Sequence, residues 1–184
     1  MTLHPRERVE QVLWPEGAAS RLEVWAVLDC ARDPAVRSAL LESRLESLCL
    51  YSGPLPRALE VVAPHLVQLL PGHRLTSRLL GEGWGRSWGV CLTIEDAANL
   101  RHHLRKLLTV RDPQGRRLLF RFYDPRVLRA YLPTCTADEW RQFAGPVASF
   151  YAEAPGGEGL LEFARDGRWL VGPGSPAAGS RPAA

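Results

Sequence analysis

The stretch from Arg117 to Leu128 constrains the fold more than any other, because an apolar segment runs through a charged junction straight into a helix start. Apolar side chains occupy both faces of residues 118–123, with Arg121 among them. This pattern predicts a strand inside or beside a packed layer, in which the guanidinium needs a partner. Asp124-Pro125 follows as an N-cap and first helical residue, so Asp124 is the nearest candidate for that partner.

Strand and helix patterns alternate along the rest of the chain. Residues 22–28 form a near-continuous apolar run, which is typical of a strand covered on both faces in a parallel sheet. Asp33-Pro34 repeats the N-cap arrangement before a helix with one apolar stripe, and Thr93–Asp96 resembles a capping box before another. Further strands are expected at 48–51, 66–69 and 87–93, and further helices at 6–13, 55–62, 75–80 and 136–143. The sequence therefore predicts an α/β fold with a mostly parallel sheet flanked by helices.

The end of the chain has a different character. Residues 147–152, 160–164 and 168–171 have strand patterns, and Asp166-Gly167 is a strong hairpin signal between the last two. From Gly172 to Ala184 the chain is Gly, Pro, Ser and Ala with one arginine, a composition that buries too little apolar surface to become ordered. We therefore predict a single domain over residues 1–171, closed by a C-terminal β-hairpin, and a disordered tail over residues 172–184.

Composition favours a cytoplasmic domain without a membrane partner. The 184 residues, 46% of them hydrophobic, suit a single core. No apolar run approaches the length of a membrane span, and the N-terminus has no apolar secretory segment. The four cysteines show no zinc-site spacing, which favours reduced core thiols. The net charge of +3 is too small to imply nucleic acid.

Five short motifs occur in a recognisable order: a strand ending in Leu-Asp, a Leu-Tyr-Ser-Gly strand, a Pro-x-Leu-Val-x-Leu segment, an Arg-Phe-x-Asp-Pro-Arg element and a Gly-Pro. They lie at Val27–Asp29, Leu50–Gly53, Pro64–Leu69, Arg121–Arg126 and Gly145-Pro146. Through them the chain resembles, over residues 24–151, the bacterial type VI secretion effector adaptors. These proteins are also called effector chaperones, and their family was first defined as a domain of unknown function.

The resemblance implies a non-catalytic, cytosolic protein that acts by binding alone. Relatives hold a toxic effector protein, often through a segment near its N-terminus, and help to load it onto the valine-glycine repeat spike protein, VgrG. The implied partners are therefore an effector and VgrG, and no cofactor is needed. Many relatives continue into a second, largely helical lobe, so this chain would correspond to the N-terminal core domain.

The residues themselves leave an alternative open. Asp29 and Asp124 both follow predicted strands, where open α/β sheets place their ligands. A small enzyme or nucleotide-binding domain would use that crevice together with Arg121 and Arg126. Helix capping and ion pairs with arginines explain the same aspartates without chemistry, and we favour this structural interpretation.

The arginines of the preceding helix extend this network. Helical spacing places Arg101 and Arg105 together at the edge of the apolar stripe, from which they could reach the charges at the strand ends. The predicted structural network comprises Arg101, Arg105, Arg121, Asp124 and Arg126.

No motif in the chain predicts a catalytic nucleophile, a metal ligand set or a phosphate loop. Gly81–Gly85 follows a helix and lacks the lysine of a P-loop. Gly85–Gly89 has the spacing Gly-x-Ser-x-Gly around Ser87, but it leads into the strand expected at 87–93 instead of joining a strand to a helix, so it does not predict a nucleophile elbow. Trp84 and Trp88 flank this glycine-rich turn and would be partner-binding anchors if exposed, although aromatic residues beside a strand more often lie in the core. An RNA-binding module that uses the arginines is a third option.

Overall fold

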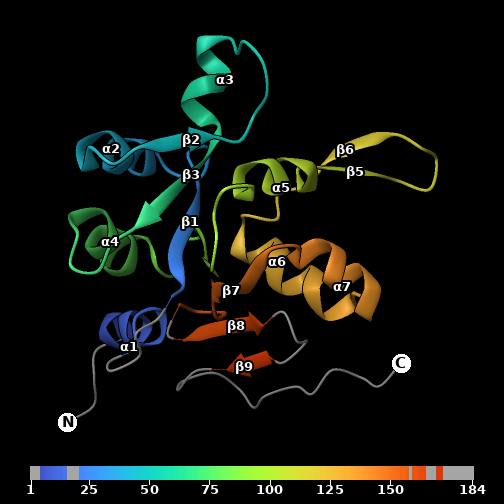
Figure 1. Cartoon of the computed structure of the whole chain (residues 1–184). Coiled ribbons are helices and arrows are strands. Elements are labelled where there is room, and N and C mark those ends of the chain that lie inside the picture. Colours follow the sequence, from blue (N-terminus) through green and yellow to red (C-terminus); the bar gives the residue numbers. More distant parts are fainter. Residues whose placement is uncertain (1–4, 16–20, 158, 165–168, 172–184) are drawn as a thin grey trace.

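The computed structural model describes residues 5–15, 21–157, 159–164 and 169–171 (Figure 1). The predicted turn at Asp166-Gly167 and the predicted tail from Gly172 to Ala184 lie outside the described residues.

An antiparallel sheet forms the centre of the described part, with the strand order β2-β3-β1-β4-β7-β8-β9. Each pair of neighbouring strands is antiparallel, so the prediction of a mostly parallel sheet is wrong. The strands are β1 Glu23–Asp29, β2 Ser47–Cys49, β3 Pro64–Leu69, β4 Gly89–Ile94, β7 Val147–Glu153, β8 Leu160–Ala164 and β9 Trp169–Val171.

The apolar run of β1 has a different cause from the one we inferred. Helices cover both faces of the sheet, so side chains of β1 on either face are buried (Figure 1). A continuous apolar run therefore indicates that both faces of the strand are buried, and it does not indicate whether the neighbouring strands are parallel or antiparallel. Direction follows from pairing: β1 lies between β3 and β4, and both run opposite to it.

One face of the sheet packs against three N-terminal helices. They are α1 Pro5–Leu13, α2 Pro34–Ser43 and α4 Arg74–Arg78, which continues into a π-helical turn, η1 Leu79–Gly83. Val24, Ala26 and Leu28 of β1 point into this core. The predicted N-cap of α2 is confirmed, because the carboxylate of Asp33 accepts the Ala35 N–H at 2.9 Å.

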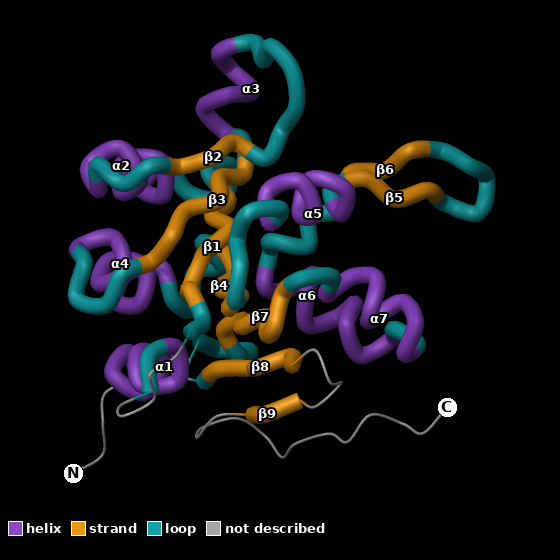
Figure 2. The backbone as a smooth tube through the Cα atoms, in the orientation of Figure 1, coloured by secondary structure: helices purple, strands orange, loops and turns teal. Residues whose placement is uncertain are grey.

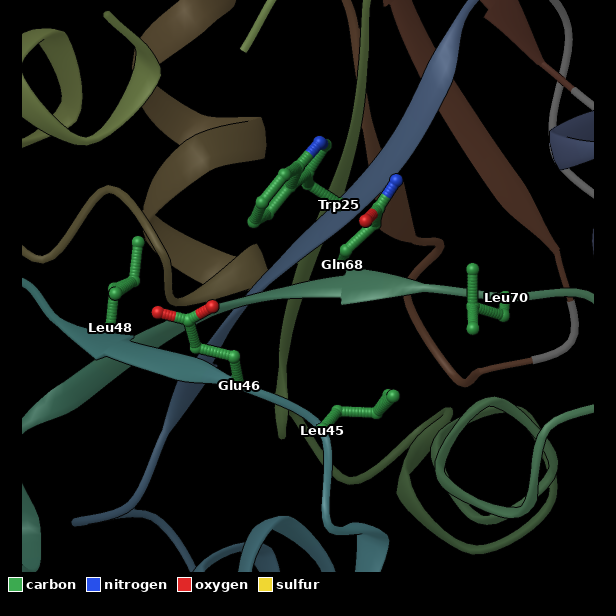
Figure 3. A pocket seen from close by; sticks show the side chains of 6 residues that line it. All are labelled: Trp25, Leu45, Glu46, Leu48, Gln68 and Leu70. Atoms are coloured by element: carbon green, nitrogen blue, oxygen red, sulfur yellow. The ribbon is translucent and has the colours of Figure 1, made fainter. Parts of the chain in front are cut away.

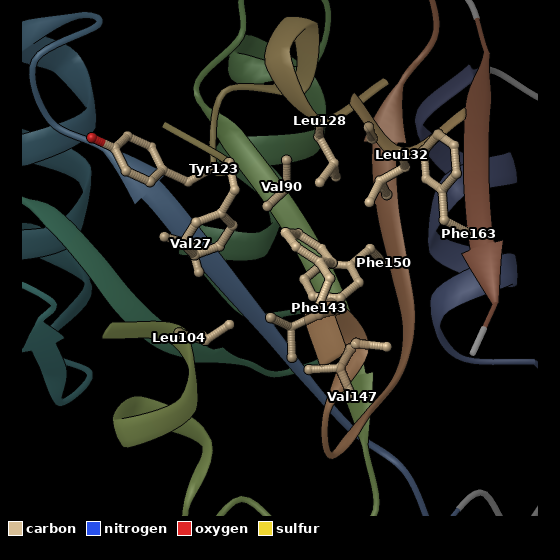
Figure 4. Packing of buried hydrophobic residues seen from close by; sticks show 14 of the residues in the cluster. Val27, Val90, Leu104, Tyr123, Leu128, Leu132, Phe143, Val147, Phe150 and Phe163 are labelled. Atoms are coloured by element: carbon tan, nitrogen blue, oxygen red, sulfur yellow. The ribbon is translucent and has the colours of Figure 1, made fainter. Parts of the chain in front are cut away.

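The other face packs against the helices of the second half. They are α5 Leu100–Leu107, α6 Pro125–Tyr131 with a short 3₁₀ turn, η2 Leu132–Thr134, and α7 Ala137–Ala144. Figure 4 shows Val27, Val90, Phe143 and Phe150 meeting in this core. The ring centroids of Phe143 and Phe150 are 5.1 Å apart, a distance typical of a favourable aromatic pair.

Two helix starts on this side were predicted with different success. Thr136 forms the predicted capping box with Glu139 at the start of α7. The capping box predicted at Thr93–Asp96 is wrong, since α5 begins only at Leu100. The carboxylate of Asp96 instead accepts the Ala98 N–H at 2.9 Å in a turn.

Two elements project from this body (Figure 2). Helix α3, Arg57–Val62, has no buried residue. Strands β5 Thr109–Arg111 and β6 Arg117–Leu119 form a separate hairpin whose strand residues are all exposed. The strand predicted over residues 118–123 is therefore too long and wrongly placed: β6 ends at Leu119, and only the following turn, with Phe122, is buried.

Candidate functional site

The charged junction after β6 reaches back to the end of β1. Arg121 forms an ion pair with Asp29, whose side chain is 1% exposed, while the Arg121 side chain is 40% exposed. The other oxygen of Asp29 accepts the Ala31 N–H at 3.0 Å. The hydrogen bond to Asp29 raises the pKa of Arg121, so the guanidinium stays charged. The predicted pairing of Arg121 with Asp124 is wrong.

Asp124 instead forms a closed unit with the first turn of α6. Its Oδ1 accepts the backbone N–H of Arg126 at 3.0 Å, which confirms the predicted N-cap. The Arg126 guanidinium adds bonds of 2.9 Å to Oδ1 and 2.6 Å to Oδ2. Burial favours the neutral acid, but these bonds and the charge of Arg126 outweigh it and lower the pKa of Asp124. Asp124 is therefore a carboxylate near neutral pH.

The two arginines of α5 do not join the strand-end charges. Arg101 donates from Nε and Nη2 to the carbonyl oxygen of Cys49, at 3.1 and 2.9 Å, and Arg105 donates to the hydroxyl of Ser52. They line an open pocket of about 330 Å³ together with Tyr51 and other residues near α3. The predicted network of five residues is therefore three separate units. Arg121 pairs with Asp29, Asp124 pairs with Arg126, and the two arginines of α5 tie that helix to Cys49 and Ser52.

A cysteine and a histidine that the sequence interpretation did not connect lie together near the end of β1. The Sγ of Cys30 is 3.6 Å from Nδ1 of His65, because the register of β1 with β3 places Leu28 opposite His65. Burial raises the pKa of the Cys30 thiol to about 12. Nδ1 lies 2.9 Å from the Ala63 carbonyl oxygen and Nε2 lies 3.1 Å from the Arg37 guanidinium. These partners assign the proton of the neutral ring to Nδ1, which donates to the Ala63 carbonyl oxygen, while Nε2 accepts from Arg37. Both ring nitrogens are therefore occupied, and the histidine does not activate the thiol.

The two tryptophans predicted as possible partner-binding anchors both donate hydrogen bonds within the protein. Trp88 is 1% exposed, and its Nε1–H donates to Asp33 at 3.3 Å. Trp84 is half-buried and donates to the Gly159 carbonyl oxygen at 3.2 Å. The turn between them is fixed by Glu153, whose carboxylate accepts the Gly85 N–H at 2.6 Å. Trp88 is therefore not available to a partner.

Exposed aliphatic side chains gather on the two projecting elements. Nine large hydrophobic residues of the described part are exposed, and six of them lie on α3 or on the β5–β6 hairpin. They are Leu59, Val61 and Val62 on α3, and Val110, Leu118 and Leu119 on the hairpin. Scattered exposed residues are ordinary, but such a concentration on protruding elements is typical of an interaction surface.

A smaller apolar hollow lies on the sheet face between β1, β2 and β3 (Figure 3). Its volume is about 150 Å³, and Trp25, Leu48 and Leu70 contribute apolar walls. The side-chain N–H groups of Trp25 and Gln68 both donate to one oxygen of Glu23, at 3.0 and 3.1 Å. The hollow has room for a single side chain of a partner rather than for a cofactor.

The described residues contain neither a metal-binding cluster nor a membrane-spanning helix. No cluster of three or more His, Cys, Asp or Glu side chains is arranged to hold a metal ion. Among the helices of the described part, none has both the length and the apolar character needed to cross a bilayer.

The fold and the strand-end ion pairs define a protein whose antiparallel sheet carries helices on both faces and projects a short helix and a hairpin. The model of a family described as a domain of unknown function (DUF4123) matches residues 24–142, and the chain belongs to this family. The matched part begins in β1 and ends in α7, so it contains Asp29, Arg121 and Asp124 but not Gly145-Pro146. No match was found among curated proteins or among solved structures.

Proposed function

We propose that this protein is a non-catalytic, cytosolic adaptor of a bacterial type VI secretion system, which binds an effector and promotes its loading onto the VgrG spike. The observation that carries the proposal is the concentration of exposed aliphatic residues on α3 and the β5–β6 hairpin. The family match and the order of the sequence motifs support the same function.

The distribution of packing suits a protein that binds through its projections. Both faces of the sheet hold well-filled cores, whereas α3 buries none of its residues and every residue of the hairpin strands is exposed. A two-stranded hairpin and a helix of this length are marginal on their own. Contact with a partner would bury their aliphatic side chains, at about 25 cal/mol per Å² of apolar surface, and would order both elements.

The enzyme alternative has no observation in its favour at the strand end. Asp29 accepts hydrogen bonds on both carboxylate oxygens, from Ala31 and from Arg121. Asp124 is satisfied in the same way by Arg126 alone. A general base or nucleophile at either position would first have to give up these bonds.

Co-expression with the effector and VgrG proteins encoded nearby tests the proposal. We expect a complex that co-elutes on size exclusion, survives chelators and keeps the effector soluble. A stable interface of this kind buries at least about 1,000 Å² in total. Replacing Leu59 and Val62 of α3 by serine should weaken the complex, whereas Leu41→Ser is the matched control, because Leu41 is 64% exposed on α2.

A different combination of results would contradict the proposal. If neither neighbour binds, and a metabolite screen finds saturable turnover that Asp124→Asn abolishes, the adaptor function is wrong and the enzyme alternative stands.

A further inference from the structure

Positive charge is concentrated between the start of α5 and the end of β6. Residues 100–119 contain six of the 23 Lys and Arg residues of the chain but only one of its 20 acidic residues. The six are Arg101, Arg105, Lys106, Arg111, Arg116 and Arg117. The single carboxylate, Asp112, is already paired with Arg116 at 2.6 Å. This segment is therefore far more basic than the chain as a whole, whose net charge is +3.

The register of the hairpin sorts its side chains onto two faces. Val110 lies directly opposite Leu118, and Arg111 lies directly opposite Arg117. Like charges placed opposite each other destabilise a sheet, and a two-stranded hairpin has little stability to spare. An anionic group between Arg111 and Arg117 would convert this repulsion into attraction.

A pocket at the root of the hairpin adds an apolar component. Its volume is about 260 Å³, and its wall includes Lys106, Leu107, Val110, Phe120 and Tyr131. Val110 thus belongs both to this pocket and to the apolar face of the hairpin. One aliphatic side chain of a partner fits beside Lys106. The wall also includes Glu139, whose carboxylate is held by Thr136 in the capping box of α7.

We propose that α5 and the β5–β6 hairpin form a docking surface for an acidic segment of a protein partner that also carries aliphatic residues. The segment adds as a strand along one edge of the hairpin, so that its alternating side chains reach both faces. Its carboxylates lie against Arg111 and Arg117 on one face, and its aliphatic side chains contact Val110 and Leu118 on the other. This inference rests on the proposed function, and it assigns the chemistry of the segment that the adaptor binds.

The arrangement of side chains favours a protein segment over a nucleic acid. Val110 and Leu118 are 39% and 47% exposed and offer nothing to a phosphate backbone. Single-stranded nucleic acids are bound by aromatic platforms on which bases stack. The aromatic residues here are engaged with each other instead: Phe120 packs edge-on against Tyr131, with ring centroids 4.8 Å apart.

A fluorescein-labelled peptide that alternates Glu and Leu is the probe for this surface. The comparison probes are the same peptide with Lys in place of Glu, and a single-stranded RNA of equal charge. Fluorescence anisotropy should show binding of the acidic peptide alone, weakened by salt. Hydrogen exchange should slow at residues 109–119 when the peptide binds.

Variants separate the two components of the surface. We expect Arg117→Glu, and separately the double variant Val110→Ser/Leu118→Ser, to weaken peptide binding by about five- to tenfold each. The matched controls are Arg74→Glu and Leu41→Ser, exposed residues of α4 and α2 on the opposite side of the sheet, which should leave binding unchanged. Circular dichroism of each variant checks that the fold is intact.

The outcomes distinguish this inference from the proposed function. If the effector or VgrG complex forms and none of the hairpin variants weakens it, while no peptide binds, the docking surface is wrong and the adaptor function stands. If neither protein binds but the acidic peptide binds at the hairpin, the surface stands and the adaptor function is wrong. RNA binding that is tighter than peptide binding, and indifferent to Val110→Ser/Leu118→Ser, would overturn the assignment to a protein segment.

Discussion

Arg121→Ala is the most informative single change in the body of the protein, because it leaves a buried carboxylate without its cation. Asp29 is 1% exposed and would retain only the hydrogen bond from the Ala31 N–H. The Arg121 side chain is itself 40% exposed, so water can partly replace it. The change therefore tests how much the strand-end ion pair contributes to stability.

The expected magnitude lies between two limits. Breaking a fully buried ion pair costs about 3–5 kcal/mol, and breaking an exposed one costs about 0–1 kcal/mol. With one partner buried and the other partly solvated, we expect a loss of about 2 kcal/mol. In a domain of this size each kcal/mol lowers the melting temperature by about 2–4 °C, so a fall of about 4–8 °C should follow.

The measurement is thermal unfolding of Arg121→Ala and Asp29→Asn beside two comparison variants. Arg117→Ala removes an exposed arginine four residues earlier and should change stability by less than about 0.5 kcal/mol. The double variant Arg121→Ala/Asp29→Asn removes the buried charge as well, while the amide oxygen of asparagine can still accept the Ala31 N–H. It should therefore be more stable than Arg121→Ala alone.

Two results would refute this reasoning. Equal melting temperatures for Arg121→Ala and Arg117→Ala would mean that the ion pair contributes nothing measurable. A double variant that loses the sum of both single losses would mean that the two residues do not interact through charge.

Three further predictions concern buried groups. Burial lowers the pKa of His65, so the unfolded chain binds a proton that the native state does not. Stability should therefore fall as the pH drops below about 6.5, the pKa of histidine in the unfolded chain. His65→Gln should make the midpoint of urea unfolding depend less on pH between about pH 7 and about pH 5. Gly89→Ala should give unstable or insoluble protein, since its Cβ would collide with the Val27 carbonyl oxygen of β1, whereas a Cβ at Gly81 meets nothing closer than 3.8 Å. Cys30, whose thiol pKa is raised to about 12 by burial, should resist iodoacetamide in the native protein and react after unfolding, as mass spectrometry would show.

Local signals predicted helix starts well. Asp33, Asp124 and Thr136 each cap a helix as expected, because the cap and the N–H that it binds lie within three residues of each other. The capping box predicted at Thr93–Asp96 is not formed, although the residue types match the motif. There β4 continues through Ile94, and pairing with its neighbouring strands overrides the local preference.

Contacts between residues far apart in the chain could not be predicted from local sequence patterns. The apolar run of β1 indicated two covered faces, but not which strands would become its neighbours or in which direction they would run. The same limit applied to the ion pair: Arg121 was matched to the nearby Asp124, while its partner Asp29 lies 92 residues away. The contact of Cys30 with His65 also depends on the register of β1 with β3, so no local pattern could have found it.

The strand-end ion pair and the projecting hairpin are parts of one arrangement. Arg121 lies two residues after β6 and three before the N-cap of α6, so its bond to Asp29 ties the returning limb of the hairpin to β1, an interior strand of the sheet. The Phe120 N–H bonds the Leu108 carbonyl oxygen at 2.8 Å, which closes the hairpin at its root. These contacts fix the root, while the exposed strands beyond it stay available to a partner. If the hairpin is the docking surface that we propose, these charged residues orient it, and Arg121→Ala should weaken binding of the acidic peptide even under conditions in which the variant remains folded.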